Sequence, residues 1–260
     1  MYSGFNLTHQ SDSFSRYQTD GESIFSNQKK QVKSQLDSFL DGTGSLSASK
    51  MQENWFPLIN AHVFISHSHS DRSKAVGLSG WLFKEFGLIS FVDSCVWGYA
   101  GDLLKLIDDK YCLNSTKDTY SYQKRNHSTS HVHMMLTTAL SKMMDQTECL
   151  IFLNTPSSLT PENVIDKNGT TLSPWIYSEI AMTRLIRRKL PKEHREIIRA
   201  DGVKKIAMAM DESLKVRYDI KLDHLTELST SELDTWKTNC QKKSTRGAVL
   251  LDELYSLKGI

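Results

Sequence analysis

The chain has 260 residues, of which 39% are hydrophobic and 24% are charged, and its net charge at pH 7 is +2. This length and apolar content suffice for one substantial core with room for a small appendage. The charge is close to neutral and no basic run is longer than Arg187-Arg188-Lys189, which argues against a nucleic-acid partner. The apolar runs are too short for a membrane span, and the polar N-terminus is unlike a signal peptide.

The spacing of the cysteines indicates whether the chain belongs to a reducing or an oxidising compartment. Their positions show no paired spacing: Cys95, Cys112, Cys149 and Cys240. We therefore expect reduced thiols and a cytoplasmic protein.

Residues 1–55 are predicted to form a polar N-terminal arm with one amphipathic helix. The helical signal comes from five apolar residues ahead of a stop at Asp41-Gly42: Phe25, Val32, Leu36, Phe39 and Leu40. We expect this helix to dock on the main domain or on a second copy of the chain.

Residues 56–215 are predicted to form an α/β domain in which short apolar strands alternate with helices. The strands are expected at 63–65, 88–92, 149–153 and 206–210, and the helices at 75–86, from 102, and at 130–144. Gly87 should stop the first of these helices. The polar segment 113–128 is a tolerated insertion or a lid. This alternation predicts a flavodoxin-like parallel sheet flanked by helices.

Residues 216–260 are predicted to form a helical extension packed on the same domain. One helix should span Ser231–Cys240 behind a capping box of Ser229 and Glu232, and a second should span Gly247–Leu257.

The carboxyl ends of the strands select the candidate ligand site, because ligands of open α/β sheets bind there. The polar residues that follow the first three strands of this domain are Ser66, His67, Ser68, Asp93, Ser94, Asn154 and Thr155.

Glu179 is the candidate catalytic residue. Ser173 is placed to cap a helix that has Pro174 at its first position. Glu179 falls on the apolar arc of that helix, one turn after Trp175. A carboxylate rarely faces a core without a function or a partner. The alternative interpretation is an ion pair with an arginine at the rim of the core.

The pattern resembles the Toll/interleukin-1 receptor (TIR) domain in its bacterial form, over residues 60–210. The matching segments are Val63-Phe64-Ile65-Ser66-His67-Ser68 with Asp71, Phe91-Val92-Asp93, Gly101-Asp102-Leu103-Leu104 with Ile107, Cys149-Leu150-Ile151-Phe152-Leu153, and Ser173-Pro174-Trp175 with Glu179. The resemblance implies a TIR-like fold and an enzyme that cleaves NAD at the nicotinamide–ribose bond, with Glu179 as its catalytic residue.

The chemistry fits this assignment. Departure of nicotinamide builds positive charge on the anomeric carbon, which one carboxylate beside the sugar stabilises. The expected NAD-binding residues are Ser66, His67, Asp93, Trp97, Tyr99, Asn154 and Trp175. Trp97 and Tyr99 are candidates to stack on adenine or to anchor their loop, and Trp175 to pack on the ribose or to fill the core.

Two alternatives from other classes stay open. His67, His69 and Asp71 form an H-x-H-x-D pattern, which also resembles the metal motif of metallo-β-lactamase-fold hydrolases, although Arg72 stands where that motif has a histidine. The chain is alternatively a TIR module that only assembles. We favour the enzyme, with NAD as substrate, no metal and no other cofactor.

The resemblance leaves the product open among ADP-ribose, a cyclic isomer and a conjugate. It implies a role in bacterial anti-phage defence of the Thoeris-like type, either by NAD depletion or by a nucleotide signal to a separate effector protein. It also implies a homo-oligomer in which the loop after the second strand completes a neighbour's site.

Overall fold

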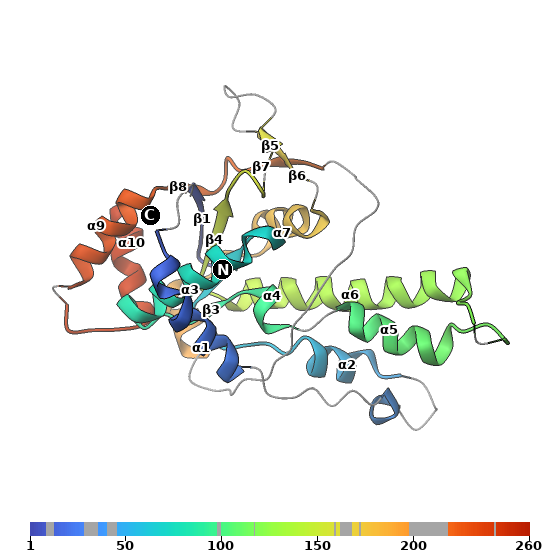
Figure 1. Ribbon diagram of the computed structural model, residues 1–260. Helices are drawn as coiled ribbons and strands as arrows, with labels where there is room; N and C mark the ends of the chain where they lie inside the picture. Colours follow the sequence, from blue (N-terminus) through green and yellow to red (C-terminus); the bar gives the residue numbers. More distant parts are fainter. Residues whose placement is uncertain are drawn as a thin grey trace.

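The computed structural model describes residues 1–8, 13–28, 36–40, 46–97, 100–116, 118–158, 160–161, 168–171, 173–197, 218–241 and 243–260. Its main sheet has five parallel strands in the order β3-β2-β4-β1-β8 (Figure 1). These strands are β1 (Ser3–Thr8), β2 (Val63–Ser66), β3 (Ser90–Phe91), β4 (Cys149–Asn154) and β8 (Thr226–Leu228). The predicted fold class, an α/β fold with a flavodoxin-like parallel sheet flanked by helices, is confirmed.

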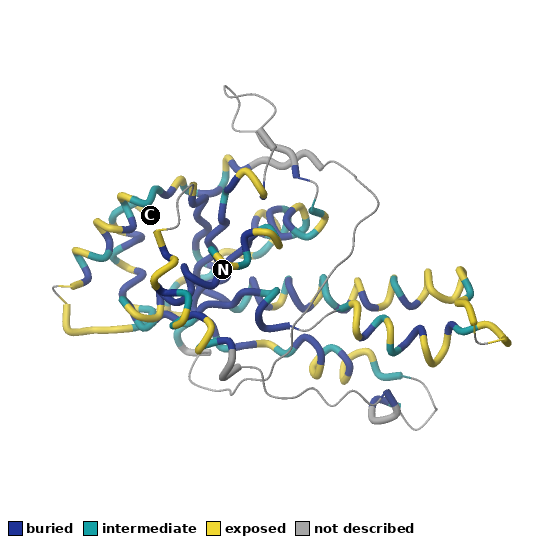
Figure 2. The backbone as a smooth tube through the Cα atoms, in the orientation of Figure 1, coloured by how far each residue is buried: buried dark blue, intermediate teal, exposed yellow. Residues whose placement is uncertain are grey.

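β4 is the centre of the sheet. It pairs with β1 from Ser3↔Cys149 to Thr8↔Asn154 and with β2 from Val63↔Cys149 to Ser66↔Phe152. β2 and the first five residues of β4 are buried throughout, as expected for strands that have helices on both faces. Figure 2 shows this buried centre.

Two helical layers cover the sheet. Right-handed connections place α1 (Gln18–Gln28) and α3 (Arg72–Phe86) on one face and α6 (Tyr122–Gln146) and α7 (Pro174–Leu185) on the other. The helix contacts agree, because α1 contacts α3 and α6 contacts α7. α9 (Thr230–Gln241) also contacts α3 and joins the first layer.

The remaining elements connect these layers. The helical ones are η1 (Ser15–Tyr17), η2 (Leu36–Phe39), α2 (Ala48–Trp55), η3 (His69–Asp71), α4 (Asp93–Val96), α5 (Ala100–Tyr111), α8 (Pro191–Ile197), η4 (Ala248–Leu250) and α10 (Leu251–Leu257). A second, antiparallel sheet consists of β5 (Thr160–Pro161), β6 (Asn168–Thr171) and β7 (Tyr218–Lys221). In Figure 1, α5 and α6 form a hairpin that projects from the body.

Several local predictions are confirmed. β2 and β4 contain the predicted strands 63–65 and 149–153. Gly87 ends α3 in the left-handed conformation, with φ 72°. At the start of α9 the Ser229 amide donates to Glu232 Oε2 over 2.8 Å and the Glu232 amide donates to Ser229 Oγ over 3.3 Å, which is the predicted capping box.

Other boundaries are corrected. The second predicted strand, 88–92, shortens to Ser90–Phe91, and α6 begins at Tyr122 rather than at 130, so part of the supposed insertion is helical. Asp108 explains that earlier start, because its buried carboxylate accepts hydrogen bonds from Arg125 and Ser128 of α6. The predicted strand 206–210 lies outside the described residues.

The N-terminal segment differs most from its prediction. β1 was not expected, yet it lies between β4 and β8 in the main sheet. The helix there, α1, begins at Gln18, and Leu36 and Phe39 lie in η2, a 3-10 helix. α1 approaches α3 closely, since a Cβ on Gly21 of α1 would meet the Val76 carbonyl oxygen of α3 at 2.1 Å. The division at residues 55 and 215 stays a prediction, although strands from both flanking parts belong to the main sheet.

Candidate active site at the carboxyl edge of the sheet

The candidate site lies where the chain leaves β2 and β4. These adjacent strands are followed by helices on opposite faces, α3 after β2 and α7 after β4, with β5 and β6 before α7. The connections therefore diverge at the carboxyl edge, and this is where open α/β sheets bind ligands.

Local sequence signals place Glu179 at this edge. Ser173 caps α7, because its hydroxyl accepts a hydrogen bond from the Ile176 amide over 3.3 Å, and Pro174 is the first residue of the helix. The face of α7 that is buried consists of Ile176, Glu179, Ile180 and Thr183. The predicted inward direction of Glu179 is confirmed.

Glu179 is a buried carboxyl group whose contact is a hydroxyl. Glu179 is only 4% exposed, and its Oε2 accepts a hydrogen bond from Ser66 Oγ over 2.5 Å. Burial raises the pKa of Glu179 well above its ordinary value, the nearby Asp93 carboxylate raises it further, and the Ser66 hydrogen bond opposes both effects. Within the described chain, no lysine, arginine or histidine forms an ion pair with Glu179. The alternative of a rim ion pair finds no support there.

His67 joins the end of β2 to the start of α4. Its Nε2 lies 2.9 Å from Ser94 Oγ, and its Nδ1 lies 3.4 Å from the Ile65 carbonyl oxygen and 3.7 Å from Asp93 Oδ1. Burial lowers the pKa of His67, and the Asp93 carboxylate acts in the opposite direction. The Asp93 side chain is 35% exposed, so solvent reaches this cluster from the α4 side.

Asp71 has a structural role that the sequence did not reveal. Its buried carboxylate accepts hydrogen bonds from the Thr155 hydroxyl and, over 2.9 Å, from Lys74 Nζ. The Ser158 hydroxyl donates to the Leu153 carbonyl oxygen over 2.9 Å and shapes the turn that holds Thr155. These bonds tie the connection after β2 to the connection after β4. In the sequence, Asp71 belonged to the TIR-like segment and to the H-x-H-x-D pattern, and Thr155 was one of the polar residues after a strand, but neither signal joined the two.

The metal-hydrolase alternative is not supported by this geometry. His67 contacts Ser94 and Asp93, whereas Asp71 contacts Thr155 and Lys74. A search of the described residues found no group of three or more His, Cys, Asp or Glu side chains that could hold a metal ion.

Trp97 and Tyr99, which follow β3, are the candidates to stack on adenine. Trp97 is 3% exposed, donates its indole N–H to the Pro57 carbonyl oxygen over 2.8 Å and packs against Phe56 and Phe91. It therefore anchors its loop in the core and offers no face to adenine. Tyr99 lies outside the described residues.

Two further candidates lie at the periphery of the cluster. Trp175 is half-buried, and its ring packs edge-on against the exposed His133 of α6, with 5.6 Å between ring centroids. This contact supports neither of its two predicted roles over the other. Asn154 is the last residue of β4 and pairs in register with Thr8 of β1. The structure thus brings together Glu179, Ser66, His67 and Asp93, and packs Trp97 into the core.

Two other findings bear on the class of protein. The four cysteines are free and buried. No helix in the described part of the chain is long and apolar enough to cross a membrane.

Comparisons of this chain with protein-family models, with curated proteins and with solved structures found no match.

Proposed function

We propose that this chain is a TIR-like enzyme that cleaves NAD at the nicotinamide–ribose bond, with Glu179 as its catalytic residue. The observation that carries the proposal is the state of Glu179, which is buried at the carboxyl edge of the sheet against Ser66 and has no cation in the described structure to balance it. Keeping such a group costs stability, and active sites are where proteins keep such groups.

The raised pKa of Glu179 suits a cationic substrate. The nicotinamide ring of NAD carries a positive charge, and an opposite charge close to a buried carboxyl group favours its ionised form. NAD binding therefore promotes loss of the Glu179 proton to solvent. The carboxylate then faces the positive charge that develops on the ribose as neutral nicotinamide leaves.

The neighbouring groups have supporting roles in this proposal. Ser66 holds one carboxyl oxygen of Glu179 through its 2.5 Å hydrogen bond. His67 and Ser94 hold the start of α4 and with it Asp93. In this proposal the half-buried Asp93 carboxylate accepts hydrogen bonds from sugar hydroxyl groups. Water, an adenine nitrogen or a small molecule then attacks the ribose.

The proposal also covers the compartment, the oligomeric state and the biological role of the chain. Free buried cysteines suit a reducing cytoplasm. By the same resemblance, we propose a homo-oligomer that acts in anti-phage defence, with NAD depletion or a nucleotide signal to a separate effector as its output. If a neighbour completes the site, specific activity falls on dilution.

Mass spectrometry of NAD incubated with the purified protein at high concentration tests the proposal. The expected products are nicotinamide plus ADP-ribose, a cyclic isomer or a conjugate, and the Glu179→Gln protein serves as the matched control. Intact NAD after prolonged incubation with folded protein over a range of concentrations would favour the module that only assembles. Equal turnover by both proteins would remove Glu179 from the mechanism.

A further inference from the structure

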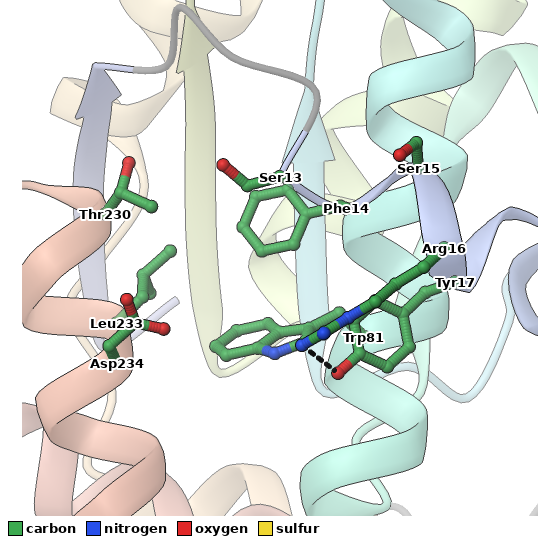
Figure 3. Close-up of a pocket in the computed structure, with 9 residues that line it drawn as sticks. All are labelled: Ser13, Phe14, Ser15, Arg16, Tyr17, Trp81, Thr230, Leu233 and Asp234. Carbon is green, nitrogen blue, oxygen red and sulfur yellow. Dashed lines mark hydrogen bonds between the residues drawn. The ribbon is translucent and has the colours of Figure 1, made fainter.

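A hollow separate from the Glu179 cluster opens among η1, α3 and α9, with a volume of about 270 Å³. Figure 3 shows Thr230 and Asp234 on the α9 side, Arg16 and Tyr17 on the η1 side, and Trp81 of α3 between them. Its walls follow the carboxyl ends of β1 and β8, which is the edge where α/β sheets bind ligands. None of its lining residues belongs to the proposed NAD site.

Apolar packing and hydrogen bonds hold the walls of the hollow in place. Its floor is apolar and closed to solvent, since Phe14, Trp81 and Leu233 are at most 5% exposed. Glu85 of α3 accepts hydrogen bonds from Tyr17 of η1 over 2.6 Å and from Lys237 of α9 over 2.7 Å, which joins all three elements. A ligand therefore meets a largely formed cavity with a polar rim.

Opposite charges stand on the two walls. Arg16 donates a hydrogen bond to the Tyr17 hydroxyl over 3.0 Å and its guanidinium lies 4.9 Å from the centre of the Tyr17 ring, so the side chain is held at the η1 wall. Asp234 lies on the α9 wall. In the part of the chain that the structure describes, neither residue forms an ion pair, with the other or with a third residue.

We propose that this hollow binds a free α-amino acid with a short polar side chain. Its carboxylate pairs with Arg16, its ammonium group pairs with Asp234, and the Thr230 hydroxyl lies on the rim for its polar atoms. A volume of 270 Å³ equals that of roughly nine water molecules at about 30 Å³ each, which suits about ten non-hydrogen atoms. A nucleotide is larger, and Asp234 repels phosphate.

Occupation of the hollow has a structural consequence. Its walls come from residues near both ends of the chain and from α3 between them. A ligand that binds all three in the folded protein stabilises their association, so above its Kd it raises the unfolding midpoint with the logarithm of its concentration. This readout is independent of NAD cleavage.

Calorimetric titration and thermal unfolding of the full chain with L-glutamine test the proposal. Two analogues each lack one charge: 4-carbamoylbutanoate has no ammonium group, and 4-aminobutanamide has no carboxylate. Glutamine should bind saturably and raise the midpoint, and each analogue should bind at least about tenfold more weakly, the scale of one lost charge-assisted hydrogen bond.

Two substitutions test whether Arg16 binds the carboxylate of the ligand and Asp234 binds its ammonium group. Arg16→Met should weaken glutamine at least about tenfold and leave 4-aminobutanamide unchanged, and Asp234→Asn should weaken glutamine and leave 4-carbamoylbutanoate unchanged. Lys124→Met on α6 and Glu53→Gln on α2 remove one charge of each sign from helices that do not line the hollow, and should change nothing. No saturable binding of glutamine to the folded protein, or equal affinity in both hollow variants and the wild type, overturns the proposal.

Discussion

Two buried glutamates at opposite edges of the same sheet show how differently one side chain is accommodated. Glu148 directly precedes β4 at the amino edge and is 0% exposed, whereas Glu179 lies at the carboxyl edge and is 4% exposed. Burial is the same for both, so the difference between them lies in their partners.

Glu148 has a full set of partners. Arg195 donates to its two carboxylate oxygens over 3.0 and 2.8 Å, and the Tyr255 hydroxyl donates over 3.1 Å. Burial alone would lower the pKa of Arg195, but hydrogen bonds to Asp252 and Glu148 raise it above its ordinary value, so the guanidinium stays charged. This arrangement ties α8 and α10 to the sheet.

Glu179 has a hydroxyl partner and a like charge nearby, Ser66 and Asp93. The comparison teaches that burial of a carboxylate alone does not indicate function. A buried carboxylate with a bidentate arginine is explained by structure, whereas one without a cation needs another reason to be retained.

The largest expected loss of stability comes from removing the arginine that pairs with Glu148. Arg195→Met leaves Glu148 buried without its cation, so we expect the free energy of unfolding to fall by about 3 to 5 kcal/mol. Urea unfolding at pH 7 measures this, with Arg188→Met, which removes an exposed guanidinium close to the Tyr2 ring, as the matched control. A loss below about 1 kcal/mol would show that the pair is no more than a surface ion pair.

A smaller effect is expected from Ser66→Ala, which removes the hydroxyl that donates to Glu179. The cost of an unsatisfied buried group is about 1 to 3 kcal/mol of unfolding free energy. The pKa of Glu179 should rise further, so NAD cleavage should shift to higher pH. Ser66→Thr keeps the hydroxyl and should restore the wild-type pH profile; an unchanged profile in Ser66→Ala would mean that this hydrogen bond does not govern Glu179.

The smallest effect is expected from Asp93→Asn. Removal of this like charge should lower the pKa of Glu179 and increase stability at neutral pH by less than about 1 kcal/mol, because solvent screens a side chain that is 35% exposed. Carbon-13 NMR of labelled glutamate carboxyl groups measures the pKa directly. A rise in the pKa of Glu179 would contradict the assigned electrostatics.

Local signals explain what was predictable in the fold. β2 and β4 are continuous apolar runs, Gly87 occupies the left-handed position after α3, and Ser229 and Glu232 stand three residues apart. Each signal lies within a few residues, and each prediction was confirmed.

β1 was not predicted because the strands that stabilise it, β4 and β8, are distant in sequence. Its Asn6 side chain is buried in the sheet, and its amide donates to Glu227 of β8 over 3.2 Å. The alternation of Phe5 and Leu7 with Gly4, Asn6 and Thr8 was a strand signal, but it stands in a polar segment without an apolar run.

The candidate site was predictable by position rather than by contact. Glu179 was found from helix periodicity and Ser66 from the end of a strand, but the hydrogen bond between them joins residues 113 positions apart. The inward packing of Trp97 depends on Pro57 and Phe56, which no pattern near Trp97 reveals.

Glu179→Gln, followed in both turnover and unfolding, tests the central claim most directly. The change preserves size and removes the charge, so NAD cleavage per folded molecule should fall by at least about 10²-fold. Because the folded pKa of Glu179 is raised, the wild type has its full stability below the unfolded pKa near 4.5 and loses some as pH rises through the folded pKa. The variant has no such loss, so its unfolding midpoint should equal that of the wild type at pH 4 and exceed it increasingly at higher pH. A variant that is destabilised at every pH and keeps wild-type turnover per folded molecule would contradict the account.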